Sequence, residues 1–176
     1  MTEILNGVTR RGRAVFSNPV PHSPVRMQNR IHFDVVGPDG QVKQSVRNVE
    51  NIMVTNGLVQ AGKLLSTSTK AGSTWAQTMA IGTSNTAANS TQSGLLNSTQ
   101  LCGTFSRSDQ GNMTARYLGT FASDGNAASI QEIGIFASNV GNDSMICRSV
   151  LTGTQSVNRG ASDQINVSYD VVLTTA

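Results

Sequence analysis

Apolar and polar residues alternate over most of the chain beyond residue 30, and this period of two predicts β-strands. The clearest case is the stretch at residues 164–174. Its apolar positions are Ile165, Val167, Tyr169, Val171 and Leu173, and the polar positions between them are Gln164, Asn166, Ser168 and Asp170. A strand with this pattern packs one face on a core and exposes the other face to water.

A β-hairpin is predicted within residues 31–50. Ile31, Phe33 and Val35 occupy every second position of its first strand, and valines continue the pattern in its second strand. Between the two strands, residues 38–40 read Pro-Asp-Gly, a combination that is typical of tight turns.

Residues 51–65 have the spacing of an amphipathic helix instead. Its apolar positions fall at i, i+4, i+7 and i+11, and they are Val54, Leu58, Ala61 and Leu65. Thr55 or Asn56 is suited to cap the N-terminus of this helix. Gly57 and Gly62 each weaken it by about 1 kcal/mol relative to Ala. We therefore expect the helix to depend on packing against a sheet.

Four further stretches alternate with a period of two, at residues 75–83, 114–123, 129–138 and 143–153. On the first of them, the positions that share one face are Trp75, Gln77, Met79 and Ile81. A loop rich in Ser, Thr, Asn and Ala follows at residues 84–93. Short strands with Gly and Asn turns predict a mostly β fold, an antiparallel β-sandwich or barrel with one short helix.

The first thirty residues differ from the rest of the chain. Five arginines lie here against one acid, whereas residues 31–176 hold eight basic and nine acidic residues. These arginines are Arg10, Arg11, Arg13, Arg26 and Arg30. Three of the four prolines also fall here, and proline favours extended backbone. The sequence thus divides into an extended basic arm, residues 1–30, and a β domain, residues 31–176.

The arginines of this arm have three possible roles. They can pair with carboxylates on another protein, which is the interpretation we favour. They can also lie free in solvent, or they can neutralise the phosphates of a nucleic acid. Only one aromatic residue, Phe16, accompanies them, and there is no dense run of Lys and Arg. Nucleic acid is therefore the least favoured partner.

The composition agrees with a folded, water-exposed β protein. Hydrophobic residues make up 38% of the chain and charged residues only 13%, with a net charge of +3. The first residues lack the apolar stretch of a signal peptide, and no apolar run is long enough to cross a membrane. We therefore expect synthesis in a reducing cytosol. Cys102 and Cys147 are expected to be ordinary core or strand residues, with a disulfide or a metal pair as the alternative.

No constellation of catalytic residues stands out. Neither His22 nor His32 has partners at a spacing that suggests a triad or a metal site, and the ten acids are scattered singly. Glu132 interrupts an apolar strand. It is predicted either to pair with an arginine across the sheet, such as Arg116 or Arg148, or to lie on an exposed face. We expect no enzymatic activity and no cofactor or metal.

The order of several short motifs resembles a module of small structural proteins in tailed-bacteriophage virions. The motifs lie at residues 51–58, 79–88, 130–136, 145–150 and 164–174, after the hairpin. The resemblance covers residues 31–174 and leaves out the arm. It implies a mostly β, non-catalytic virion protein that is present in many copies. Within such a module we expect structural roles for Glu132, Arg148 and Trp75.

The resemblance also implies a location in the virion, after assembly in the host cytoplasm. An arm without a core becomes ordered only on a neighbouring subunit, which suits a capsid decoration or cement protein that stabilises the head. A tail, baseplate or fibre-attachment protein is the alternative. The expected partners are other virion proteins, either the major capsid protein or tail proteins, together with further copies of the chain as a homo-oligomer. No membrane partner is expected.

Overall fold

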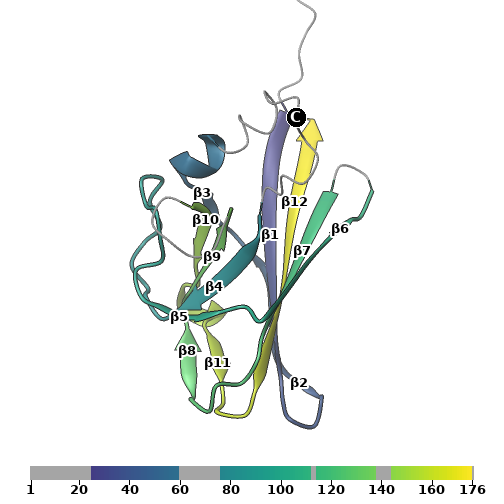
Figure 1. Ribbon diagram of the computed structural model, residues 1–176, viewed down its shortest axis with the longest axis vertical. Helices are drawn as coiled ribbons and strands as arrows, with labels where there is room; N and C mark the ends of the chain where they lie inside the picture. The colour runs from purple at the N-terminus through teal and green to yellow at the C-terminus, as the bar shows by residue number, and fades with distance from the viewer. Residues whose placement is uncertain (1–24, 60–75, 112–113, 138–143, 176) are drawn as a thin grey trace, which may run out of the picture.

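The computed structural model describes residues 25–59, 76–111, 114–137 and 144–175. Two antiparallel five-stranded sheets pack face to face as a β-sandwich (Figure 1). The predicted mostly β class is therefore confirmed, and of the two architectures expected the sandwich is the one observed. A helical turn at residues 55–59 lies beside the sheets.

Sheet A contains the long strands at the right of Figure 1. In hydrogen-bonded order they are β2 (Val42–Val49), β1 (Val25–Val36), β12 (Gln164–Thr175), β7 (Thr114–Phe121) and β6 (Thr104–Asp109). β1 and β12 pair along their whole length, from Val25 opposite Thr175 to Val36 opposite Gln164. The predicted hairpin is confirmed, because β1 and β2 pair antiparallel on either side of the Pro-Asp-Gly turn.

Sheet B is made of shorter strands. Their order is β3 (Ile52–Met53), β10 (Met145–Val150), β9 (Glu132–Phe136), β4 (Thr78–Gly82) and β5 (Ser98–Leu101). A small third sheet pairs β11 (Val157–Arg159) with β8 (Ala128–Ile130), and a 3-10 turn, η1, spans Gly153–Gln155.

The main core lies between the inner faces of the two sheets. Phe33 and Tyr169 come from sheet A, and Met79 and Ile133 come from sheet B, and each side chain is at most 1% exposed. On β12 the predicted apolar face points into this core, as far as its described side chains show. Each such side chain contributes roughly 1.5–3 kcal/mol by leaving water.

Sheet B is covered on both faces, which the alternating pattern did not predict. All five residues of β9 are buried. A second cluster of buried side chains, formed by Val54, Ala80, Phe136 and Met145 with Leu95 packed against it, lies apart from the main core. The loop at residues 83–97 and the helical turn supply this cover. A strand that is buried on both faces has no wet side, so the alternation predicted for residues 129–138 does not divide β9 into a buried face and an exposed face.

The helical turn packs against sheet B, but the predicted apolar face is buried only in part. Val54 is fully buried, but Leu58 is 60% exposed, and Ala61 and Leu65 lie outside the described residues. Gly57 faces β10 so closely that a Cβ atom would lie 2.2 Å from the Ile146 carbonyl oxygen. A glycine at this helical position therefore permits the contact with the sheet.

The start of β1 moves the predicted boundary between the N-terminal arm and the β domain from residue 30 to residue 24. This strand begins at Val25, so Arg26 and Arg30 belong to sheet A and not to an arm that ends at residue 30. Residues 25–30 do not alternate strongly, and they are held as a strand by pairing with β12. The other three arginines of the predicted arm lie in residues 1–24, outside the described residues.

Candidate functional site

Glu132 and Arg148 form a buried ion pair across neighbouring strands of sheet B. Arg148 Nε donates a hydrogen bond of 2.9 Å to Glu132 Oε2. Nη2 lies 2.8 Å from the same oxygen, in a charge contact that is not a second hydrogen bond. Both side chains are 0% exposed. The prediction of an arginine partner for Glu132 is confirmed with Arg148.

This ion pair holds the 83–97 loop against the outer face of sheet B. Glu132 accepts hydrogen bonds from the backbone N–H groups of Leu96 at 3.2 Å and Asn97 at 2.7 Å. Arg148 Nη1 donates to the Thr86 carbonyl oxygen, 3.0 Å away. Arg148 Nη1 also donates to Gln92 Oε1 at 3.1 Å, so four hydrogen bonds join the loop to the two buried charges. The role is structural, because neither charged group is open to a substrate.

Arg116, the other arginine considered for Glu132, pairs with Asp170 instead. Its Nε and Nη2 each donate to one carboxylate oxygen of Asp170 at 2.7 Å. The pair joins β7 to β12 on the outer face of sheet A. These hydrogen bonds from Arg116 lower the pKa of Asp170 below its ordinary value of 3.8.

We expect Asp170→Asn to weaken the protein by about 1–2 kcal/mol at neutral pH, because it removes charge-assisted hydrogen bonds. A carboxyl group whose pKa is lowered by folding stabilises the protein above its unfolded pKa, and this contribution is lost as the pH falls through the folded value. Urea unfolding between pH 6 and pH 2 should therefore show a difference between wild type and variant that shrinks below about pH 4. A difference that is independent of pH would contradict this role.

Both cysteines are free thiols, so the alternative of a disulfide is wrong. Cys147 Sγ donates to the Tyr169 hydroxyl at 3.2 Å, and burial raises the pKa of this thiol to about 12. Cys102 Sγ accepts the backbone N–H of Met79 at 3.3 Å. Within the described ranges no cluster of three or more His, Cys, Asp or Glu side chains is placed to hold a metal ion.

Three other residues were singled out for chemistry or structure, and only one of them lies in the described part of the chain. His22 and Trp75 lie outside the described residues. His32 Nδ1 accepts a hydrogen bond of 3.2 Å from the backbone N–H of Asn48. Burial, followed by the charge of Arg47, lowers the pKa of His32 below 6.5 and favours this neutral acceptor.

Asn48 marks the point where β2 turns away from β1. Its φ angle is 56°, in the left-handed region that Asn tolerates better than most residues. The register shifts here by one residue, because Ile31 pairs with Val49 but Phe33 pairs with Val46. Such a bulge increases the local twist, and β2 ends one residue later at Val49.

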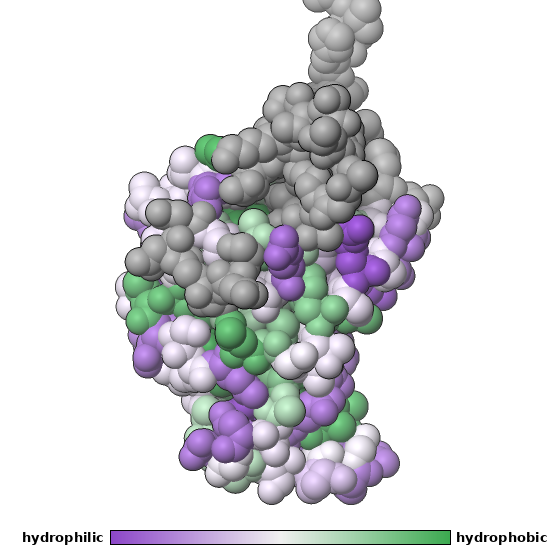
Figure 2. Space-filling view, in the orientation of Figure 1, coloured by the Kyte–Doolittle hydropathy of each residue, from purple (hydrophilic) through white to green (hydrophobic). Residues whose placement is uncertain are grey.

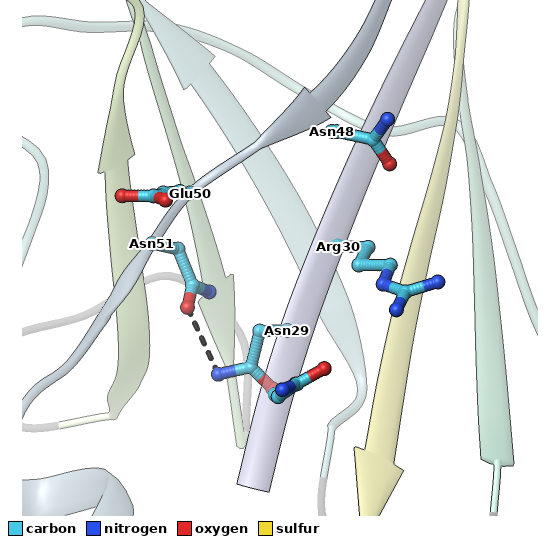
Figure 3. A pocket seen from close by; sticks show the side chains of 6 residues that line it. Asn29, Arg30, Asn48, Glu50 and Asn51 are labelled. Carbon is cyan, nitrogen blue, oxygen red and sulfur yellow. Dashed lines mark hydrogen bonds between the residues drawn. The ribbon is translucent and has the colours of Figure 1, made fainter.

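Beyond this bulge lies an open recess of about 680 Å³, which we call the polar hollow (Figure 3). Its described lining is entirely polar: Gln28, Asn29 and Arg30 from β1, and Asn48, Glu50 and Asn51 from the end of β2 and the link to β3. Sequence analysis placed Arg30 among residues that contact a partner but did not identify the others. The amides are common in this chain, so no local signal distinguished them.

Two of the amide groups in the polar hollow, those of Asn29 and Asn51, are held in place by hydrogen bonds that lead to Tyr169 in the core. Asn29 Nδ2 donates to Asn51 Oδ1 at 2.9 Å, and Asn51 Nδ2 donates to the Tyr169 hydroxyl at 3.1 Å (Figure 3). This row of hydrogen bonds continues to Cys147 in the core. Asn29 Oδ1 is shielded from solvent and has no partner among the described residues.

Charges of both signs lie at the rim of the polar hollow. Arg30 and Glu50 are exposed, and Figure 3 shows Arg30 directed away from the Asn29–Asn51 pair. Over the face drawn in Figure 2, apolar and polar residues are interspersed. The hollow thus combines hydrogen-bond donors, acceptors and one charge of each sign. This arrangement is suited to binding a polar group or a peptide backbone.

Comparison of the chain with protein-family models, with curated proteins and with solved structures gave no significant match. Among the described residues, no helix has the length and apolar character needed to cross a membrane.

Proposed function

We propose that this chain is a non-enzymatic structural protein of a tailed-bacteriophage virion. In this proposal it binds neighbouring virion subunits on the head, as a decoration or cement protein of the capsid. Its partners are the major capsid protein and further copies of itself.

One observation carries the proposal that the chain binds other polypeptides. β1 extends six residues beyond the last residue that pairs with β2, so residues 25–30 pair with β12 alone among the described strands. The backbone groups on the other side of such an edge are available to pair with an added strand. The polar hollow lies at this edge.

The buried charges support a structural role over a catalytic one. Glu132 is used to hold a loop, and Asp170 is used to join two strands. Arg159 is likewise almost fully buried and lies 2.7 Å from Asp124, which connects the small third sheet to a turn. Each of these charged groups already has a partner that fixes an element of the fold. The location in a virion rests on the resemblance of the sequence motifs.

The proposed function is tested in the phage or lysogen that carries the coding sequence. We expect quantitative mass spectrometry of purified particles to find the chain in many copies, comparable with the capsid protein. Particles made without the chain should retain their heads but break at lower temperature. A few copies per particle, with tailless or non-adsorbing particles on deletion, would instead indicate a tail component. Absence of the chain from purified particles would refute a virion role of either kind.

A nucleic-acid role is tested separately with the purified chain. Binding through the arginines of residues 1–30 would fall steeply as salt is raised, because phosphate contacts release counterions. We expect no binding to DNA or RNA at about 50 mM salt. Tight binding that is lost when the three arginines of residues 1–24 are replaced would contradict the proposed protein partner.

A further inference from the structure

The edge of β1 at residues 25–30 is long enough to pair with one further strand of six residues. Val25 to Arg30 each have a partner on β12, from Thr175 to Asp170, but no described strand faces them on the other side. Six residues of strand span about 20 Å. The chain leaves this position after Val49, because the bulge at Asn48 directs it through Glu50 and Asn51 toward β3 in the other sheet. Among the described strands, the position next to residues 25–30 of β1 is therefore vacant.

The polar hollow is lined from both faces of this edge. Gln28 and Arg30 alternate with Asn29 along β1, so they point to the opposite face, and Asn29 points to Asn51 (Figure 3). A recess that wraps around a strand edge in this way fits an extended peptide, whose side chains also alternate.

We propose that the vacant strand position is filled by residues 13–18 of a second copy of this chain. This inference rests on the proposed function, of which it specifies one contact. Pairing with β1 requires backbone N–H groups, so the added segment must be free of proline. Residues 1–18 contain no proline, and Gly7 and Gly12, which weaken a strand, leave residues 1–6 and residues 13–18 as the glycine-free stretches of six.

Charge selects between these two stretches. Glu50 and Arg30 are the two exposed charges of the polar hollow. Arg30 is directed across β12, whereas Glu50 lies on the side of β1 away from β12 (Figure 3). No ion pair engages Glu50 among the described residues. Residues 13–18, Arg-Ala-Val-Phe-Ser-Asn, carry a positive charge at Arg13, whereas residues 1–6 carry the negative charge of Glu3. Residues 13–18 also include Val15 and Phe16, which favour strands.

The prolines favour docking on another copy over docking on the same chain. Residues 19–24, which would form the connecting loop, include Pro19, Pro21 and Pro24. Proline-rich segments are extended by about 3.1 Å per residue, whereas hairpin loops usually contain two to five residues and reverse the chain tightly. Six extended residues span about 19 Å, which is long enough for residues 13–18 to reach a neighbouring subunit.

Site-directed crosslinking between two full-length variants tests the exchange. One preparation carries Gln28→Cys in the polar hollow, and the other carries Ser17→Cys in the donated segment. The matched control is Ser106→Cys, an exposed position on β6 at the opposite edge of sheet A. After mixing and treatment with a short bismaleimide, we expect the Gln28→Cys and Ser17→Cys pair to form crosslinked dimers. Their yield should exceed that of the control pair by about tenfold or more, because docking raises the effective concentration.

Charge reversal provides a second readout that does not depend on the crosslinking position. Arg13→Glu in the donor should reduce the crosslinked dimer several-fold, and Glu50→Arg in the acceptor should restore it. In a chain with both Gln28→Cys and Ser17→Cys, excess wild-type protein should suppress the crosslink.

A crosslink yield equal to the Ser106→Cys control would overturn the exchange. An internal crosslink that excess wild-type protein does not suppress would also overturn it, because the segment then docks on its own chain. These experiments use the purified chain alone, so they are independent of whether the chain is found in virions. Failure of the exchange and failure of the proposed function are thereby distinguished.

Discussion

Replacing Glu132 by Ala is expected to destabilise the protein by about 3–5 kcal/mol, because it leaves the charge of Arg148 buried without its partner. The substitution also removes the acceptor for the backbone N–H groups of Leu96 and Asn97. In urea unfolding the midpoint should fall by about 2 M, for an m-value of about 2 kcal/mol/M. Hydrogen exchange at the amides of Leu96 and Asn97 should accelerate in the variants that remain folded.

Two further variants isolate the cause of this loss. Glu50→Ala removes an exposed glutamate and should change stability by no more than about 0.5 kcal/mol. The double variant Glu132→Leu with Arg148→Met removes both buried charges, and it should recover part of the loss because no charge then lacks a partner. A loss at Glu132→Ala no larger than at Glu50→Ala would show that the buried pair is unimportant. Recovery close to zero would indicate that the loop hydrogen bonds dominate over the charge.

Gly82→Ala is expected to destabilise the protein by about 2–3 kcal/mol, because the new methyl group has no space. A Cβ atom at this position would lie 2.3 Å from the Asn97 carbonyl oxygen and 2.5 Å from Glu132 Oε1. The first of these atoms belongs to the backbone, so it cannot rotate away. Relief of the clash requires the 83–97 loop to move off sheet B, which also disturbs the ion pair beneath it.

Gly94 is the matched control for this substitution, since it lies in the same loop. A Cβ atom on Gly94 would meet no atom within 4 Å, and its backbone is not in the left-handed region. Gly94→Ala should therefore be neutral, or stabilising by up to about 0.5 kcal/mol through the lower entropy of the unfolded chain. Thermal and urea unfolding of both variants check the contrast. Equal effects at the two glycines would mean that the loop does not pack closely at Gly82.

The strands that the sequence predicts well are those with one wet face. β12 and β1 were predicted because their buried residues recur at every second position. β2 was predicted from the turn before it, since only Val46 and Val49 of this strand are buried and Val42 is exposed. β6 and β5 were missed, because Thr104–Asp109 and Ser98–Leu101 are largely polar and exposed at sheet edges. Edge strands bury little, so their sequences contain a weak signal. β11 was missed because it has only three residues.

The candidate site was predicted only in its buried part. A glutamate inside an apolar strand requires a partner, so the pairing of Glu132 with an arginine followed from its position. Which arginine it contacts, Arg148 or Arg116, depended on strand order and register. The polar hollow had no such signal, because Asn29 and Asn51 come together only when β1 and the link to β3 meet.

The amino-acid sequence by itself therefore determined the β class, the hairpin, the terminal strand and the need for a partner at Glu132. These features follow from local periodicity and from the cost of burying a lone charge. Only the tertiary structure decided that sheet B is covered on both faces and that β1 starts at Val25. It also decided that residues 25–30 of β1 extend beyond β2 and pair with β12 alone among the described strands. Each of these depends on contacts between residues far apart in the chain, which local patterns do not encode.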